Sequence, residues 1–428
     1  MKRVLVVAYY FPPMGLSGVQ RITKFVKYLP DFGWKPTVLT VEPGGYFAFD
    51  PELENEVQSS EIRVVRTQSL DPTRLFKRKS TVSLPAESSR KWMSSISQAL
   101  FIPDNKVGWV RPAVRRALAL HEETPFDVIL ATVPPYSAAL VARKVAKKTG
   151  VPFVVDYRDD WLDNPRHAYP TPIHRYLHQV LEKNVLLESA AVVSINERIC
   201  ARIKGRLHSY SADPGSDRVR ILPQGYDRED LAGKQSLTKG GMLTLLYSGV
   251  FYDAQTPDFF LKALSGFINE NPDYAPHIRA VFVGLVPESS KALAESLGLA
   301  QYIEYTGYVS HSQAIKHVLG ADILWMTVGE GKGQELISTS KLFEYMGTQK
   351  PILGLVPEGA AKDALMRYKA SWVVSPGDIQ AIHRSLETIY MGWDKGLLPE
   401  ANADYVEQIE RKNLTGQLSE LLDRAAAL

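Results

Sequence analysis

Residues Gln334 to Pro351 read Gln-Glu-Leu-Ile-Ser-Thr-Ser-Lys-Leu-Phe-Glu-Tyr-Met-Gly-Thr-Gln-Lys-Pro. One apolar run, Ala321 to Val328, precedes this stretch, and a second run, Ile352 to Val356, follows it. The hydroxyls at 338–340 favour a helix start, and residues 341–346 have helical spacing. The stretch therefore predicts a strand, a loop, a helix and a second strand, as in a parallel α/β sheet.

The start of this helix suits an anionic ligand. A helix that begins at the carboxyl end of a parallel strand directs free N–H groups and a positive dipole end above the sheet. The hydroxyls of Ser338, Thr339 and Ser340 and the ammonium of Lys341 suit a phosphate. Glu344, one turn further on, can accept hydrogen bonds from sugar hydroxyls. The alternative is an ordinary capped helix whose lysine and glutamate lie in water.

Length and composition bound the class of protein. A chain of 428 residues favours two domains, and 45% hydrophobic with 23% charged residues is typical of a globular protein. The net charge of +3 gives no argument for nucleic acid. The apolar run that begins at Val4 ends in Pro-Pro without a cleavage site, so it predicts a first strand rather than a signal peptide. No apolar run reaches the roughly 18 residues of a membrane-spanning helix.

Cysteine and histidine usage gives no sign of a metal. The only cysteine in the sequence, Cys200, excludes a disulfide within the chain and a cysteine-based zinc site. It also favours a reducing, cytoplasmic location. His174 and His178 are one helical turn apart, but no other ligand pattern accompanies them. We therefore expect neither a metal nor a cofactor.

Apolar runs and helical segments alternate along the first half of the chain. Continuous apolar runs are typical of parallel strands buried on both faces. The predicted strands are residues 4–10, 34–41, 62–67, 126–132, 152–157 and 191–194. The loop after the first strand contains Gly15 and Gly18, which let the backbone approach a ligand closely. It lacks Gly-x-Gly-x-x-Gly, which excludes a dinucleotide fingerprint, and a tight turn is the other interpretation.

Charged residues follow the predicted strand at 152–157. Asp156, Arg158 and Asp159 lie where open α/β sheets place ligands. Carboxylates beside an arginine at such an edge can orient or deprotonate a hydroxyl. The alternative is a local ion pair between aspartate and arginine that holds the loop.

Residues 69–109 interrupt the α/β pattern. Basic residues between Arg74 and Lys79 flank Leu75 and Phe76, and Trp92 lies further along. Basic residues mixed with large apolar ones suit the surface of an anionic membrane. A solvated insertion with a few anchoring aromatic residues is the alternative.

The second half of the chain repeats the alternation. Its predicted strands are residues 243–249, 278–284, 302–306, 323–328, 351–355 and 371–375. A polar, glycine-containing segment at 234–241 is typical of a linker. Two successive runs of strands and helices predict two Rossmann-like domains.

The segment from Lys341 to Leu353 resembles the donor-binding signature of retaining glycosyltransferases of family 4. In that family a Glu-x7-Glu motif spans this loop and helix. Its second glutamate holds the nucleotide ribose, a role that the resemblance gives to Glu344. The first glutamate falls at Leu336, beside Glu335, so the sequence departs from the motif at the usual contact to the donor sugar. Several members of a branch that builds surface polysaccharides share this lysine-containing form.

Other segments extend the resemblance. The loop with Gly15 and Gly18 is similar to the glycine loop that faces the donor diphosphate and the acceptor. The turn at 307–311 resembles one whose backbone, at Val309, contacts the nucleotide base. The Asp-x-Arg-Asp-x-Trp segment at 156–161 faces the acceptor in the polysaccharide branch.

The phosphate-binding cations of the family are missing after the first strand of the second domain. Family members commonly place an arginine and then a lysine there. In this chain Gly249 ends the strand, and neither Val250 nor Gln255 is a cation. Lys341, assisted by the helix dipole, is then the best remaining candidate for the phosphate charge. The chain also lacks Asp-x-Asp, the signature of metal-dependent glycosyltransferases of another fold.

The resemblance implies the α/β class and the GT-B fold, in which two Rossmann-like domains face each other across a cleft. We place an acceptor-side domain at 1–238, with an insertion at 69–109. A nucleotide-sugar-binding domain follows at 239–400. The helical segment at 401–428 is expected to return to the first domain, as it does in GT-B enzymes.

We expect a retaining, metal-independent, hexosyltransferase-type enzyme of polysaccharide biosynthesis. It moves a sugar from a nucleotide diphosphate, expected to be UDP, to a saccharide or a lipid-linked saccharide. The expected catalytic residues are Lys341, Asp156, Asp159 and Arg158. The expected donor-binding residues are Gly15, Gly18, Gly249, Val309, Ser338, Thr339, Ser340 and Glu344.

Two other functions stay open at this point. A nucleotide-sugar epimerase shares the GT-B fold and needs no acceptor. A non-catalytic partner subunit is favoured by the missing acidic residue at 336 and by the missing cations. The cytoplasmic location leaves open a peripheral attachment to the inner face of the membrane.

Overall fold

The computed structural model describes residues 1–15, 17–44, 49–71, 97–165, 167–211, 216–233, 241–251 and 255–428. The contacts within it divide the chain into two compact units. The N-terminal unit comprises Met1–Gln224 and Arg411–Leu428, and the C-terminal unit comprises Gly225–Glu410. The sequence analysis placed the boundary at residue 238 and the returning segment at 401–428.

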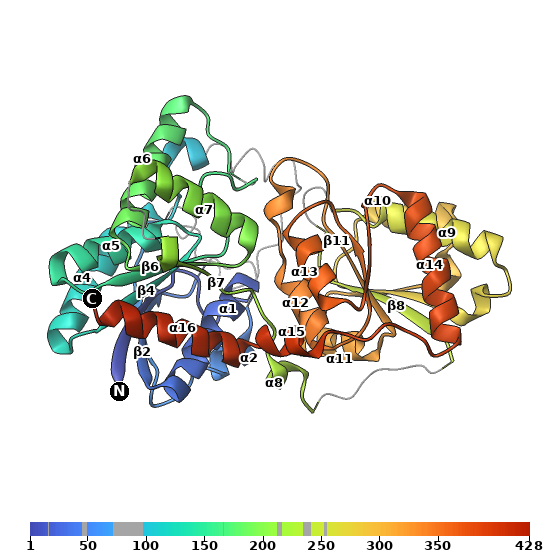
Figure 1. Cartoon of the computed structure of the whole chain (residues 1–428), viewed down its shortest axis with the longest axis horizontal. Helices are drawn as coiled ribbons and strands as arrows, with labels where there is room; N and C mark the ends of the chain where they lie inside the picture. Colours follow the sequence, from blue (N-terminus) through green and yellow to red (C-terminus); the bar gives the residue numbers. More distant parts are fainter. Residues whose placement is uncertain are drawn as a thin grey trace. The chain divides into compact units, whose positions relative to one another are not determined.

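The N-terminal unit is built on a seven-stranded parallel sheet (Figure 1). The strand order is β3-β2-β1-β4-β5-β6-β7. The strands are β1 (Lys2–Val7), β2 (Trp34–Val41), β3 (Arg63–Thr67), β4 (Val128–Val133), β5 (Phe153–Tyr157), β6 (Ala191–Ser194) and β7 (Val219–Ile221). The central strands are buried on both faces, as their continuous apolar runs predicted.

Helices cover both faces of this sheet. They are α1 (Ser17–Tyr28), α2 (Pro51–Asn55), α4 (Val110–Glu123), α5 (Ser137–Thr149), α6 (Pro172–Glu188), α7 (Glu197–Tyr210) and α16 (Arg411–Ala426), with short 3₁₀ turns at η1 (Leu29–Phe32), η3 (Val107–Trp109) and η4 (Ser216–Arg218). Apolar residues of α1 and α16 share one core with alternate residues of the central strands. The right-handed connections between successive parallel strands place α4 to α7 on the other face.

The C-terminal unit is built on a six-stranded parallel sheet in the order β10-β9-β8-β11-β12-β13 (Figure 1). The strands are β8 (Leu243–Ser248), β9 (Ile278–Val283), β10 (Ile303–Gly307), β11 (Ile323–Thr327), β12 (Ile352–Leu355) and β13 (Ser371–Val374). The two sheets confirm the predicted α/β class and the pair of Rossmann-like domains.

Two apolar cores enclose this second sheet. The helices and 3₁₀ turns are α8 (Arg228–Leu231), α9 (Asp258–Glu270), η5 (Ala275–His277), α10 (Glu288–Ser296), η6 (Ala300–Tyr302), α11 (His311–Gly320), η7 (Gln334–Leu336), α12 (Ser340–Gly347), α13 (Ala360–Tyr368), α14 (Ile379–Asp394) and α15 (Ala403–Gln408). One core joins α9, α10 and α14 to the sheet, and the other joins α11, α12, α13 and α15. The strand, loop, helix and strand expected at 321–356 are therefore β11, η7 with its loops, α12 and β12.

Most of the predicted insertion at 69–109 lies outside the described residues. These include Arg74 to Lys79 and Trp92, on which the membrane interpretation rests. Trp109, at the end of the segment, is buried, and its indole N–H donates to Thr67 Oγ1 at 2.8 Å. Trp109 is thus a core residue of the N-terminal unit. Within the described part of the chain, no helix combines the length and apolarity needed to cross a membrane.

Candidate functional site

A side chain from the second half of α12 links this helix to the end of β8 in the C-terminal unit. The Tyr345 hydroxyl accepts a hydrogen bond from the backbone N–H of Ser248 at 2.7 Å. Thr339 precedes the helix in an extended conformation, and its side chain makes no capping hydrogen bond. The buried Thr339 Oγ1 has no hydrogen-bond partner within the described residues. A hydroxyl without a hydrogen-bond partner at a helix start is a candidate to form a hydrogen bond with a ligand.

The other two hydroxyls flank this position. Ser338 is buried, and Ser340 is the first residue of α12 rather than its cap. The structure thus brings all three predicted hydroxyl residues and Lys341 into one turn. The Leu342 N–H donates to the Thr339 carbonyl at 3.2 Å, whereas the N–H groups of Ser340 and Lys341 lie too near the helix start for a carbonyl partner within α12 and can serve an anion.

The Lys341 side chain packs on the end of β8. Its Nζ lies 3.8 Å from the centre of the Tyr247 ring, over the ring face. Among the described residues, no hydrogen bond or ion pair to this Nζ is found. Burial lowers the pKa of Lys341 to about 7, and the nearby charge of Glu344 only partly opposes this shift. An anion beside Nζ would therefore stabilise the ammonium form.

Glycines at the ends of β8, β9 and β10 let these backbone segments pack closely against one another, next to the Lys341 side chain. Gly249, Gly284 and Gly307 have φ values of 131°, 117° and 68°. The Gly284 N–H donates to the Gly307 carbonyl at 2.9 Å, and a Cβ on Gly284 would overlap the Gly249 carbonyl. A Cβ on Gly249 would lie only 2.8 Å from Lys341 Nζ. Gly249 therefore provides the space that Lys341 occupies.

Glu344 has a partner that sequence reasoning missed. The His311 Nε2 lies 2.8 Å from Glu344 Oε2, and both side chains are partly exposed. His311 is the first residue of α11, directly after the turn that contains Val309. Val309 packs partly buried against the core on this side of the sheet. The structure therefore joins the two segments that the resemblance assigned to ribose and base.

The departures from the family motif have structural consequences. Leu336 is only 4% exposed and belongs to the fold's interior, whereas the neighbouring Glu335 is partly exposed. Phe251 stacks on Tyr247 with ring centres 4.1 Å apart, on the segment where the family places a cation. Val250 and Gln255 are partly buried. The Tyr247 ring thus contacts both the Phe251 ring and the Lys341 ammonium.

In the N-terminal unit, Asp156 forms a buried ion pair with Arg21. Its Oδ1 lies 2.9 Å from Arg21 Nη2, and both side chains are 1% exposed. Thr132 Oγ1 donates to the other oxygen at 2.9 Å. Arg21 also donates to the carbonyl of Leu222 at 2.9 Å and to that of Pro223. This geometry matches the alternative of a structural ion pair, with Arg21 rather than Arg158 as the partner.

Arg158 is also tied to the backbone. Its guanidinium donates to the carbonyl of Gly18 at 2.7 Å and to those of Val133 and Pro134. A Cβ on Gly18 would overlap this guanidinium. Gly18 is therefore needed to accommodate Arg158, and Gly15 lies buried in the same loop. Desolvation lowers the pKa of Arg158, against the effect of Asp156 and Asp159.

Asp159 differs from these residues because it is partly exposed. In the described part of the chain, its carboxylate has no hydrogen bond or ion pair within contact distance. It lies just beyond the carboxyl end of β5, close enough to Arg158 and Tyr136 to influence their pKa values. Of the three predicted residues at this strand end, Asp159 is the one available to a ligand.

Within the C-terminal unit, one group of described side chains is close enough to hold a metal ion. The ligand atoms of Glu270, His383 and Glu387 lie within 4.8 Å of one another. They come from the end of α9 and from α14, where His383 and Glu387 are one turn apart. Sequence reasoning missed this group because its first member is more than a hundred residues from the others. The group involves none of the predicted site residues.

Two family models match the chain. A glycosyl transferase 4-like domain matches residues 18–223, and a glycosyl transferases group 1 domain matches residues 229–408. No curated protein matches the sequence. The fold and these matches define a protein of the GT-B glycosyltransferase class. The chain thus carries a glycosyl transferase 4-like domain followed by a group 1 domain.

Solved structures support the same fold along the full chain. Sucrose-phosphate synthase from Thermosynechococcus elongatus has 12% identity and a TM-score of 0.64, with 100% of each chain covered. The lipopolysaccharide outer core galactosyltransferase WaaB has 13% identity and a TM-score of 0.58, with 99% of each chain covered. A putative UDP-N-acetylglucosamine 2-epimerase from Listeria monocytogenes has 10% identity and a TM-score of 0.53, covering 97% of this chain and 94% of the other. At these identities the likeness establishes the GT-B fold alone.

Proposed function

We propose that the protein transfers a sugar from a nucleotide diphosphate to a saccharide or lipid-linked saccharide, with retention of configuration. UDP is the nucleotide that we propose, and a hexose the transferred group. The C-terminal unit binds the donor, and the N-terminal unit binds the acceptor. The two matched glycosyltransferase domains favour this function over that of an epimerase.

The placement of Lys341 is the observation that carries the proposal. A cation with no anionic contact partner in the described structure lies at the start of α12, over Tyr247 and Gly249. Thr339, whose hydroxyl has no partner among the described residues, and the first backbone N–H groups of α12 belong to the same helix start. As the bond between sugar and diphosphate breaks, the leaving group gains negative charge, which these groups stabilise. The arrangement supplies positive charge without a bound cation, so we propose metal-independent chemistry.

The pair of Glu344 and His311 lies one turn further along α12. We propose that Glu344 accepts hydrogen bonds from the ribose hydroxyls and that His311 orients its carboxylate. Val309 precedes α11 in the same turn and presents its backbone to the base. Together these residues form the nucleoside end of the donor site, and Lys341 forms its diphosphate end.

On the acceptor side, we assign the direct role to Asp159. Its partly exposed carboxylate can orient an acceptor hydroxyl at the end of β5. Asp156 and Arg158 hold the loop through Arg21 and through the Gly18 carbonyl, so we propose that they position Asp159. Gly15 and Gly18 shape the loop that follows β1.

A thermal-shift panel of nucleotides and nucleotide sugars tests the donor site. Binding to the native state raises the melting temperature by mass action. We expect a shift with UDP and with one or more UDP-sugars that is reduced in Glu344→Ala and Lys341→Met. Glu358→Ala, which changes an exposed residue of the same unit, is the matched control. No shift with any nucleotide diphosphate would reject the proposed donor site.

Two alternatives differ in what turnover requires. An epimerase would form product from the donor alone, whereas a transferase needs an acceptor. The structural likeness to an epimerase keeps that comparison relevant. A non-catalytic partner subunit would bind a nucleotide without turnover on any acceptor, and buried Leu336 in place of the motif glutamate is the feature that favours it.

We further propose that the protein works at the inner face of the membrane, where a lipid-linked saccharide acceptor would lie. The basic and aromatic residues within 69–109 motivate this step. Binding to anionic vesicles should weaken at high salt, because such charge attraction is screened. Equal binding to neutral and anionic vesicles would count against it.

A further inference from the structure

A polar pocket of about 380 Å³ opens between α6 and α7 in the N-terminal unit. Its lining consists of Leu162, Asp163, Arg175, Gln179, Arg202, Gly205, Arg206, Ser209 and Tyr210. Arg175 and Gln179 are one turn apart on α6, as are Arg202 and Arg206 on α7. Helical spacing therefore directs two pairs of polar side chains to one place.

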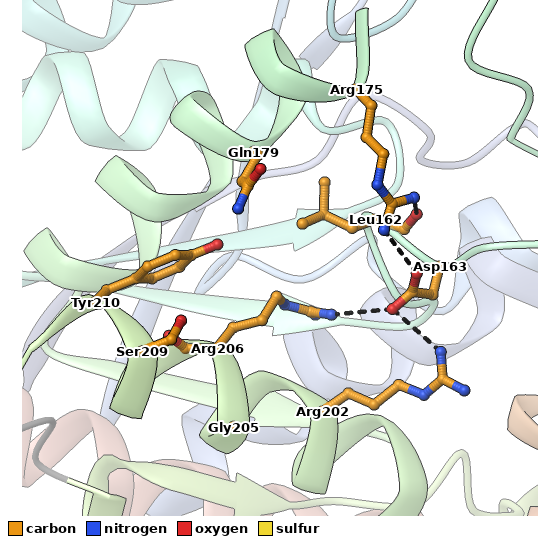
Figure 2. Close-up of a pocket in the computed structure, with 9 residues that line it drawn as sticks. All are labelled: Leu162, Asp163, Arg175, Gln179, Arg202, Gly205, Arg206, Ser209 and Tyr210. Carbon is orange, nitrogen blue, oxygen red and sulfur yellow. Dashed lines mark hydrogen bonds and ion pairs between the residues drawn. The ribbon is translucent and has the colours of Figure 1, made fainter. Parts of the chain in front are cut away.

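Three guanidinium groups converge on one carboxylate in this pocket (Figure 2). Asp163 Oδ1 lies 3.3 Å from Arg175 Nη2. Asp163 Oδ2 lies 3.1 Å from Arg202 Nη1 and 3.5 Å from Arg206 Nη1. Asp163 is the only carboxylate among the residues that line the pocket, and the three guanidinium groups share it.

Arg206 is held in place by two buried carboxylates beside the pocket. Its side chain is 14% exposed and lies 2.9 Å from Asp160 Oδ2 and 3.0 Å from Glu182 Oε2. The guanidinium is thereby held with one edge toward Asp163. Arg175 and Arg202 are more exposed, at 52% and 36%, and can move toward a ligand. The pocket thus combines one fixed guanidinium with two adjustable ones.

The remaining lining offers neutral hydrogen-bonding groups. Figure 2 shows Gln179 and Tyr210 on the side of the pocket away from Asp163. A Cβ on Gly205 would meet no atom within 4 Å, so the pocket is open there. Convergent guanidinium forks match the oxygens of a phosphate in both charge and geometry.

We propose that this pocket binds a phosphate group, carried as a phosphomonoester or a diphosphate, through Arg175, Arg202 and Arg206. Asp163 occupies the place of the anion in the empty pocket and competes with it. The pocket belongs to the N-terminal unit and is separate from the donor residues of the C-terminal unit.

The proposed function suggests what carries this phosphate. Asp163 is four residues beyond Asp159 along the loop that leaves β5. An acceptor that bears a phosphate would place it in the pocket while a sugar hydroxyl meets Asp159. This step alone rests on the proposed function, whereas phosphate binding itself does not.

Calorimetric titration of the full chain with inorganic diphosphate tests the pocket. We expect Arg175→Gln combined with Arg202→Gln to weaken binding by about tenfold or more, because two charge-assisted contacts are lost. Arg115→Gln, which changes an exposed arginine on α4, is the control and should bind as the unchanged protein does. Arg206 is left intact because its buried ion pairs support the fold.

A second variant gives a change in the opposite direction. Asp163→Asn removes the competing carboxylate and should strengthen diphosphate binding several-fold, which a purely structural role of Asp163 would not do. Diphosphate can also enter the proposed donor site, so each titration is repeated with Lys341→Met. If diphosphate binds in the pocket, the arginine and Asp163 variants should change its affinity in the same way whether or not Lys341 is replaced. This result is expected even if the proposed donor site proves wrong.

Vesicles distinguish a lipid headgroup from a free phosphate. If the phosphate comes from a lipid, vesicles of phosphatidic acid in phosphatidylcholine should bind the unchanged protein and Arg115→Gln more strongly than the double variant. If it comes from a free ligand, only diphosphate should show that difference. The proposal is overturned when the double variant matches Arg115→Gln with both probes, or when Asp163→Asn does not strengthen binding of the active probe.

Discussion

Removing the charge of Lys341 should impair both donor binding and turnover. The Lys341 Nζ lies 3.8 Å from the centre of the Tyr247 ring. A side chain at position 249 would collide with this Nζ, since even a Cβ there would lie 2.8 Å from it. We expect Lys341→Ala to lower kcat about a hundredfold, or about 3 kcal/mol, comparable to the loss of one oxyanion donor. Because the lysine acts mainly on charge that develops in the transition state, KM should change less. Lys341→Arg should recover only part of the activity.

The pKa of Lys341 gives an independent readout. Since burial lowers this pKa to about 7, much of the lysine is neutral in the empty site above that pH. A diphosphate would raise the pKa again, so binding a UDP-sugar should take up a fraction of a proton that grows as the pH rises from 7 to 8. The affinity should accordingly fall above pH 7, by at most about tenfold per pH unit.

Calorimetry in buffers of different ionisation enthalpy measures this uptake. Lys341→Met keeps a long apolar side chain and should abolish the proton uptake together with the pH dependence. Glu358→Ala should retain both. Proton uptake that persists in Lys341→Met, or a near-unchanged kcat in Lys341→Ala, would refute the assignment of the diphosphate charge to this lysine.

The remaining predictions concern four other features. Glu344→Ala should weaken UDP binding by about 1.5–3 kcal/mol in calorimetry, the range for hydrogen bonds to a charged group, and an unchanged affinity would exclude Glu344 from the site. Gly249→Ala should reduce kcat through displacement of Lys341, whereas Gly298→Ala, also at positive φ but in open space, should not; equal kcat values would argue against the packing account. Asp156→Asn should lower the free energy of unfolding by about 3–5 kcal/mol because Arg21 loses its buried partner, while Asp159→Asn should lower kcat with little change in denaturant midpoint; the reverse pattern would exchange their roles. The rate of sugar transfer should be the same with and without excess EDTA. A loss of activity that magnesium or manganese restores would contradict the metal-independent mechanism.

Much of the fold was accessible from the sequence because local patterns determine it. Continuous apolar runs such as that from Val4, separated by helical segments, predicted parallel strands and two α/β domains. The helix at Lys341 to Met346 was also predicted from spacing and hydroxyl residues, and it placed Lys341 and Glu344 on α12. These inferences need only the neighbours of each residue along the chain.

The contacts of the candidate site depend on tertiary structure and were not predicted. Arg21 and Asp156 are 135 positions apart, and nothing in either local pattern indicates their pairing. His311 reaches Glu344 only because the fold brings the start of α11 beside the middle of α12. The pocket at Asp163 had one local signal, the four-residue spacing of Arg202 and Arg206. Its third arginine, on α6, is brought there by the fold.

The most direct test of the central claim is acceptor-dependent release of nucleoside diphosphate. The protein is incubated with a donor identified by thermal shift, with and without saccharide and lipid-linked saccharide acceptors. Mass spectrometry then follows both the nucleotide and the sugar. We expect nucleotide release only with an acceptor, which gains one sugar, and about a hundredfold less with Lys341→Ala. Conversion of the donor sugar without an acceptor, or tight donor binding without transfer to any acceptor, would contradict the account.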